Sequence, residues 1–126
     1  MNRKKILIID DDEAAVFGYT NYLSQEGYAI TSAETLEDGL RSLSADRFDA
    51  VIFDVRLPDG NSLDAIPGVR AANPALRIFV ISGLTDAATS QRAIGCGVDK
   101  FLVKPLSMSE LCRTIAASLE EQSPDR

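Results

Sequence analysis

Short apolar runs alternate with helical patterns five times along the chain. The strand-like runs lie at Ile6–Ile9, Tyr28–Ser32, Ala50–Phe53, Ile78–Ile81 and Phe101–Val103. A run of about four apolar residues between polar ones is typical of a strand that is buried on both faces. Strands of this kind that alternate with helices predict a parallel sheet, joined by right-handed crossovers and covered by helices.

The helical segments carry their own start and stop signals. The first helix is expected to begin at Asp12 or Glu13 and to end before Gly27, because glycine commonly follows a helix C-terminus. The second is expected from Thr35 and the fifth from Ser107. Each of these hydroxyl residues is followed three positions later by an acidic residue, the spacing of a capping box.

The third helix is the least regular in sequence. It is expected to begin near Asn61 or Ser62 and to end before Asn73. The pair Pro67-Gly68 lies inside it, and because proline lacks a backbone N–H, we expect this pair to shorten or bend the first turns.

The fourth helical segment, residues 85–94, is rich in alanine and polar residues, so we expect it to be the least firmly packed. Together the five units predict an α/β fold, a flavodoxin-like three-layer sandwich whose five-stranded parallel sheet has the order 2-1-3-4-5. We expect one domain over residues 1–126, with a core over 4–119 and a polar tail or linker start at 120–126.

Composition excludes several classes of protein. The chain has 126 residues, of which 45% are hydrophobic and 25% charged, as expected of one globular domain. The net charge of −6 lacks the basic footprint of a nucleic-acid binder. No apolar run approaches the roughly 18 residues that span a membrane, and no signal-peptide pattern is visible, so we expect a cytoplasmic protein. The chain has no histidine and no CxxC pair, which argues against a zinc site.

Acidic residues follow two of the predicted strands directly. Asp10, Asp11 and Asp12 come after the first strand, and Asp54 comes after the third. These two strands are neighbours in the order 2-1-3-4-5, so their carboxyl ends meet at the switch point where ligands bind in such sheets. Two carboxylates about 4 Å apart repel by on the order of 4 kcal/mol at an effective dielectric constant of about 20. The cluster therefore requires a cation, although Asp12 is better explained as a helix N-cap.

Two further polar residues lie at the carboxyl ends of the fourth and fifth strands. Ser82 follows the fourth strand and Lys104 follows the fifth. Oxygen ligands beside a phosphoryl group suit Mg²⁺ or Mn²⁺. In such a site Asp54 can act as the nucleophile and form an acyl phosphate. Lys104 offers a compact positive charge and Ser82 a hydroxyl donor for the phosphoryl oxygens.

Four segments in this order carry a family resemblance: residues 8–12 (Ile-Ile-Asp-Asp-Asp), 54–60 (Asp-Val-Arg-Leu-Pro-Asp-Gly), 82–83 (Ser-Gly) and 97–105 (Gly-Val-Asp-Lys-Phe-Leu-Val-Lys-Pro). Over nearly its whole length the chain resembles the receiver domain of two-component response regulators, such as chemotaxis regulators. The Leu-Pro-Asp-Gly segment and the proline in the third helix are most similar to receivers of enhancer-binding transcription activators.

The resemblance implies a magnesium-dependent phosphoacceptor site. By the family pattern, Asp54 accepts a phosphoryl group from the phosphohistidine of a sensor histidine kinase or a phosphotransfer protein. Asp11 is implied as a direct metal ligand and Asp10 mainly as a ligand through water. The backbone carbonyl of Arg56 and Asp54 itself complete the protein ligands.

The resemblance also implies a switch. Ser82 and Lys104 are expected to bind the phosphoryl oxygens, and Phe101 to move inward as Ser82 engages them. From the residues alone, Phe101 is equally well explained by core packing. The surface of the fourth helix, fifth strand and fifth helix then changes and contacts an output domain in cis or a second copy. Such a domain catalyses its own phosphorylation and dephosphorylation, and contacts neither nucleic acid nor membrane directly.

Three other functions remain open alternatives. A phosphohydrolase of the haloacid dehalogenase type uses a second aspartate two positions after the nucleophile, where this chain has Arg56, and usually a cap domain. A flavodoxin-like FMN binder needs a Ser/Thr/Gly-rich loop after the first strand, where this chain has three aspartates. A degenerate receiver that serves only as an interaction module is disfavoured by the intact Asp54, Asp11 and Lys104.

Two smaller interpretations concern turns. The pair Asp59-Gly60 has the composition of a turn, and Asp99 is read as a residue that ends a turn before the fifth strand.

Overall fold

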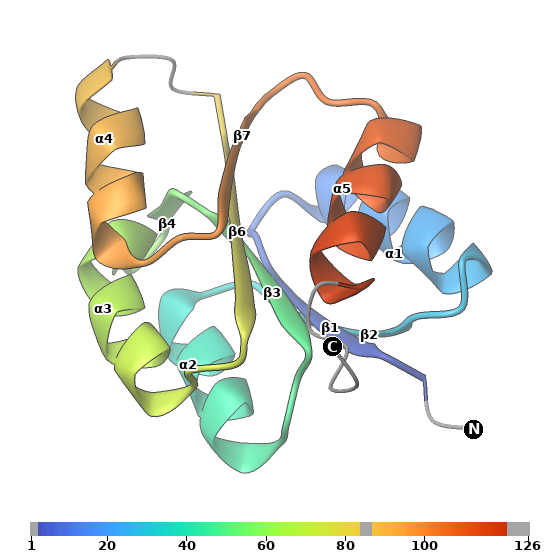
Figure 1. Cartoon of the computed structure of the whole chain (residues 1–126), viewed down its shortest axis with the longest axis horizontal. Coiled ribbons are helices and arrows are strands. Elements are labelled where there is room, and N and C mark those ends of the chain that lie inside the picture. Colours follow the sequence, from blue (N-terminus) through green and yellow to red (C-terminus); the bar gives the residue numbers. More distant parts are fainter. Residues whose placement is uncertain (1–2, 84–86, 121–126) are drawn as a thin grey trace.

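The computed structural model describes residues 3–83 and 87–120. Five long strands form one parallel sheet in the order β2-β1-β3-β6-β7, which is the predicted 2-1-3-4-5 once two very short strands are left out of the numbering. In Figure 1, α1 and α5 cover one face of this sheet, and α2, α3 and α4 cover the other. The elements in chain order are β1 Lys5–Ile9, α1 Glu13–Gln25, β2 Ala29–Ala33, α2 Leu36–Ala45, β3 Ala50–Asp54, β4 Arg56–Leu57, β5 Gly60–Asn61, α3 Ser62–Ala72, β6 Arg77–Ser82, α4 Ala87–Cys96, β7 Lys100–Val103 and α5 Met108–Glu120.

The central strands send alternate side chains into two hydrophobic cores, one on each face of the sheet. Because β1, β3 and β6 are buried on both faces, their sequences are continuous apolar runs rather than alternating ones. The core beneath α2, α3 and α4 receives Leu7, Ile9, Val51, Phe53, Ile78 and Val80. The core beneath α1 and α5 receives Ile6, Ile8, Ala50, Ile52, Phe79 and Ile81.

Three helices are capped where the sequence predicts it. Each cap is a side-chain oxygen that accepts a hydrogen bond from a backbone N–H of the first turn. The N–H groups of Ala14 and Ala15 donate to Asp12 Oδ1 over 3.0 and 3.3 Å, that of Asp38 donates to Thr35 Oγ1 over 3.1 Å, and that of Glu110 donates to Ser107 Oγ over 3.1 Å. The predicted glycine after the first helix is also confirmed, since Gly27 has a φ of 98°.

The third helix runs from Ser62 to Ala72 through Pro67, so the proline does not shorten it, and the alternative expectation of a bend stays a prediction. Proline at 67 removes the N–H that would bond to the carbonyl of Leu63, four residues earlier. The thiol of Cys96 in α4 donates to this carbonyl instead, with Sγ 3.4 Å from the oxygen. A donor from the neighbouring helix thus replaces the one that proline lacks.

Helix α4 is lightly anchored, as its weak periodicity predicts. Ala93 is its one buried side chain among residues 88–96, and Ile94 is 67% exposed. The predicted helix start at Thr85 lies outside the described residues. Across the part of the chain that the structure describes, no helix is long and apolar enough to cross a bilayer.

Gly39 of α2 packs against Ile9 of β1. A Cβ at this position would overlap the Ile9 side chain and lie 2.8 Å from its Cγ1. Ile9 is fully buried and has little room to move. We therefore expect Gly39→Ala to lower the free energy of unfolding by about 1–3 kcal/mol, the usual cost of overpacking, despite a gain in helix propensity of about 1 kcal/mol. Urea denaturation would measure this change.

Gly18 in α1 provides the matched control. A Cβ there would meet no atom within 4 Å, so Gly18→Ala is expected to stabilise the protein by about 0.5–1 kcal/mol. Equal stability of the two alanine variants would contradict the close packing of α2 on β1.

Candidate functional site

Three carboxylates meet at the carboxyl ends of β1 and β3. Asp10 and Asp11 follow β1, Asp54 ends β3, and one oxygen of each lies within 4.8 Å of the other two. Asp10 is buried, Asp11 is exposed and the Asp54 side chain is 17% exposed. The adjacent strands thus place the predicted acidic residues within reach of one cation.

The third aspartate of the row has a different place. The backbone N–H of Asp12 donates to Asp10 Oδ1 over 2.9 Å, and the Asp12 side chain caps α1. This hydrogen bond holds Oδ1 of Asp10 toward the backbone of Asp12. The row is therefore divided, as predicted, into two residues of the acidic cluster and one helix cap.

Lys104 brings a positive charge to this cluster. Its Nζ lies 3.9 Å from Oδ2 of Asp10 and 3.9 Å from Oδ1 of Asp54. Its backbone N–H donates to the carbonyl of Ser82 over 2.8 Å, which anchors the segment after β7 against the end of β6. The lysine offsets part of the repulsion between the two carboxylates.

The acidic cluster perturbs two titratable groups. Burial, followed by the negative charge of Asp10, raises the pKa of Asp54 to about 6, while the Lys104 charge lowers it in part. Burial also raises the pKa of Tyr19 in α1 to about 12, and the charges of Asp10, Asp54 and Asp12 add to this shift. The clustered carboxylates of Asp10, Asp11 and Asp54 make the site negative, which favours a bound cation.

The loop after Asp54 is fixed by its own hydrogen bonds. The Ser62 hydroxyl donates to the Asp54 carbonyl, and the Ser62 N–H donates to the Val55 carbonyl over 2.8 Å. Arg56 lies in β4, where it pairs with Asn61 of β5. This hairpin leaves no signal in the sequence, because strands of two residues are too short to show a periodic pattern.

Ser82 and Phe101 lie on neighbouring strands beside the cluster. Ser82 ends β6, is 1% exposed, and follows Ile81, which pairs with Asp54. Phe101 in β7 pairs with Val80 and is half-buried against the core beneath α2, α3 and α4. Ser82 therefore lies one residue beyond the partner of Asp54, and Phe101 lies one strand further out, so their phosphate-binding and switching roles remain predictions.

A family model of the response regulator receiver domain matches residues 6–116. The chain belongs to this family. The strand order and the acidic cluster of this receiver domain agree with that assignment. As a class, receivers are signalling domains of two-component systems.

Curated relatives are longer than this chain. It is 30% identical over 121 residues to the response regulator MprA of Mycolicibacterium vanbaalenii, covering 96% of the chain and 52% of MprA. It is 31% identical over 124 residues to the DNA-binding transcriptional regulator NtrC of Azospirillum brasilense, covering 98% of the chain and 26% of NtrC. The receiver domain thus spans about half the length of MprA and about a quarter of the length of NtrC.

Solved structures have the same fold. A CheY-like receiver domain protein from Methanospirillum hungatei superposes with a TM-score of 0.94 at 27% identity, covering 99% of this chain and all (100%) of that one. The receiver domain of NtrC4, solved as a beryllofluoride-activated dimer, has a TM-score of 0.89 at 30% identity, covering 94% of this chain and 98% of that one. This confirms the flavodoxin-like arrangement predicted from the sequence.

Two aspartates that the sequence assigns to turns make long-range contacts in this receiver. The carboxylate of Asp59 accepts hydrogen bonds from the N–H groups of Leu36 and Glu37 in α2. That of Asp99 accepts one from Arg70 of α3, over 2.7 Å. Neither contact can be recognised from the neighbouring sequence, because the partners lie more than 20 residues away.

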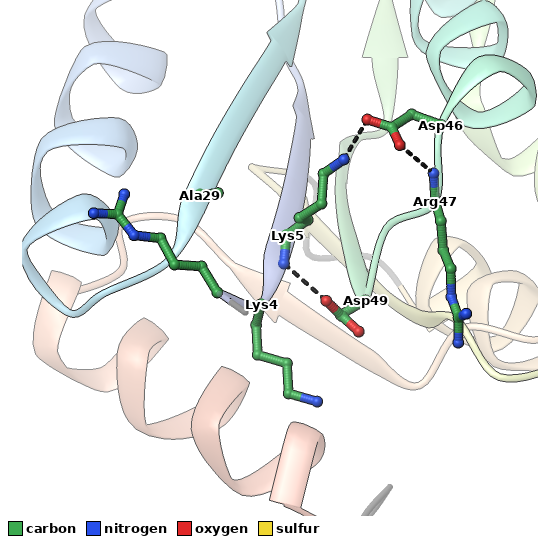
Figure 2. A pocket seen from close by; sticks show the side chains of 7 residues that line it. Lys4, Lys5, Ala29, Asp46, Arg47 and Asp49 are labelled. Carbon is green, nitrogen blue, oxygen red and sulfur yellow. Dashed lines mark hydrogen bonds and ion pairs between the residues drawn. The ribbon is translucent and has the colours of Figure 1, made fainter. Parts of the chain in front are cut away.

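A hollow of about 610 Å³ lies at the other end of the strands, where β1 and β2 begin (Figure 2). Lys5 makes an ion pair with Asp46, and its N–H donates to Asp49 Oδ2 over 2.8 Å. The lining is Arg3, Lys4, Lys5, Ala29, Asp46, Arg47 and Asp49. The bonds among Lys5, Asp46 and Asp49 hold neighbouring segments of the fold together, so we place the functional site at the aspartate cluster.

Proposed function

We propose that this receiver domain accepts a phosphoryl group on Asp54, from the phosphohistidine of a sensor histidine kinase or a phosphotransfer protein, in a reaction that needs Mg²⁺ or Mn²⁺. The observation that carries the proposal is the convergence of Asp10, Asp11 and Asp54 within 4.8 Å of one another, with Lys104 3.9 Å from two of them. Acidic oxygens and one amine around a half-buried carboxylate suit phosphoryl transfer to that carboxylate.

The donor set fits a hard divalent cation. Asp10, Asp11 and Asp54 supply carboxylate oxygens, the ligands that Mg²⁺ prefers, and the Arg56 carbonyl is our candidate for a further ligand. When bound, the cation neutralises these carboxylates and the oxygens of the incoming phosphoryl group.

The protein residues account for the remaining chemistry. An Asp54 oxygen attacks phosphorus, the bond from phosphorus to the imidazole nitrogen breaks, and the histidine leaves with that electron pair. With a pKa of about 6, Asp54 is mostly ionised at pH 7.5 and can act as the nucleophile. Lys104 and the Ser82 hydroxyl bind phosphoryl oxygens, and hydrolysis of the aspartyl phosphate by the same site resets the domain.

The signal leaves through the face formed by α4, β7 and α5, with Phe101 as the switch residue. Ile94 and Val103 on these elements are 67% and 39% exposed, and such apolar surface suits contact with another protein. The solved NtrC4 receiver is a dimer in its activated form. Our proposal is that this face joins a second copy or an output domain in cis.

The same proposal covers the domain's setting. We place it in the cytoplasm as a single domain over residues 1–126, with 120–126 as a tail or linker start. The net charge of −6 supports an arrangement in which any nucleic-acid contact belongs to a separate output domain.

The direct test is exposure of the purified protein to acetyl phosphate with Mg²⁺, followed by intact mass and peptide mapping. We expect the mass gain of one phosphoryl group on the peptide that contains Asp54, and no gain in excess EDTA. Labelling at another residue, or labelling unaffected by EDTA, would contradict the proposed site. Sustained turnover of a phosphomonoester would instead favour the phosphohydrolase alternative.

A further inference from the structure

Asp59 fastens the loop that follows Asp54 to the N-terminus of α2. Its Oδ1 accepts a hydrogen bond from the Leu36 N–H over 2.8 Å, and its Oδ2 accepts one from the Glu37 N–H over 2.9 Å. These bonds satisfy two of the four N–H groups that a helix leaves unpaired at its start. They also lower the pKa of Asp59, so the carboxylate stays ionised at neutral pH.

The position of Asp59 in the hairpin gives these bonds a second consequence. Arg56 and Leu57 pair with Asn61 and Gly60, so Asp59 lies in the turn between the two strands. At the base of the hairpin, the Ser62 hydroxyl donates to the carbonyl of the residue that ends β3. Arg56 therefore lies between a fixed base and a turn that is fastened to α2.

We propose that Asp59 is a positioning residue, which holds the Arg56 carbonyl in place for the bound cation by fastening the hairpin to α2. This inference rests on the proposed function, because it assumes a metal at the aspartate cluster. The role differs from plain helix capping, since Thr35 caps the same helix end independently through the Asp38 N–H at 3.1 Å.

The comparison of Asp59→Ala with Thr35→Ala separates the two roles. Each variant removes side-chain capping from the N-terminus of α2, and only the first releases the hairpin. Calorimetric titration of the full chain with Mg²⁺ at pH 7.5 is expected to show binding about tenfold weaker in Asp59→Ala, the low end of the loss typical of residues that orient metal ligands. Thr35→Ala is expected to bind Mg²⁺ as the wild type does.

Hydrogen exchange provides a readout that needs no metal. The amides of Leu36 and Glu37 are expected to exchange faster in Asp59→Ala, and the amide of Asp38 faster in Thr35→Ala, which verifies that each cap is lost in a folded protein. Asp59→Asn keeps one acceptor oxygen and is expected to restore part of the Mg²⁺ affinity.

The outcomes distinguish this inference from the proposed function. Wild-type affinity in Asp59→Ala, or an equal loss in Asp59→Ala and Thr35→Ala, would overturn the positioning role while leaving phosphorylation of Asp54 intact. A wild-type protein that neither binds Mg²⁺ nor becomes labelled by acetyl phosphate would overturn both.

Discussion

Asp54→Asn is expected to make the metal-free protein more resistant to urea at pH 7.5, and to lose this advantage near pH 4. Folding raises the pKa of Asp54 from its ordinary value of 3.8 to about 6, because the group is half-buried and faces Asp10. The folded state therefore binds the proton more tightly than the unfolded chain. The resulting stability is fully present below about pH 4 and is lost as the pH rises through about 6.

The size of this effect follows from the pKa difference. Two pKa units correspond to at most about 3 kcal/mol. With 17% of the side chain exposed, we expect solvent to reduce the gain in Asp54→Asn to about 1–2 kcal/mol. The measurement is the difference in urea midpoint between variant and wild type in EDTA at both pH values, because other carboxylates titrate alike in the two proteins.

Asp11→Asn is the control for charge removal from the same cluster. Asp11 is exposed, so its substitution is expected to stabilise the metal-free protein less. Adding Mg²⁺ should reduce the advantage of Asp54→Asn, since a cation neutralises the wild-type carboxylates. An Asp54→Asn protein less stable than wild type at pH 7.5 without metal would show that the Lys104 contact outweighs burial.

Lys104→Met is expected to slow phosphorylation of Asp54 by acetyl phosphate about 100-fold, the loss typical when one donor to a developing negative charge is removed. The Nζ of Lys104 lies 3.9 Å from Asp54, where it can reach an oxygen of the transferred group. Mg²⁺ affinity is expected to stay equal or to increase, because the substitution removes a positive charge near the metal. Rapid-quench mass spectrometry and calorimetric titration measure the two quantities.

Opposite changes in rate and metal affinity distinguish this result from partial unfolding, which would lower both. Lys100→Met is the matched control, because Lys100 begins β7, the strand that Lys104 follows, and its side chain is exposed, so its substitution should change neither quantity. An unchanged rate in Lys104→Met would remove this lysine from the proposed chemistry.

Much of this architecture could be predicted because its signals are local. The apolar runs of β1 and β3 report burial on both faces, and the hydroxyl of Thr35 caps α2 within three residues of its own position. The meeting of Asp10 with Asp54 needed one further step, the strand order, which connection rules nearly determine. The strand order thus brings Asp10 and Asp54, which are 44 positions apart in sequence, next to each other.

The features that escaped prediction depend on partners distant in sequence. Asp59 has the composition of a turn residue, and nothing nearby indicates that α2 will present two N–H groups to it. Proline inside a helix is expected to interrupt it, because its N–H is missing. Here the Cys96 thiol of another helix donates to the carbonyl that Pro67 leaves without a partner in its own helix. Such contacts appear only when the elements are packed together.

The bond from Cys96 to the Leu63 carbonyl has a practical consequence for spectroscopic work on this protein. The chain offers two thiols for attaching a fluorophore or spin label, Cys96 and Cys112, and both are free. A probe on Cys96 would replace the S–H that donates to the Leu63 carbonyl of α3. Its signal would then come from a helix pair that the labelling had altered. Cys96→Ser, whose hydroxyl can still donate, leaves Cys112 in α5 as the single attachment point from which to follow activation.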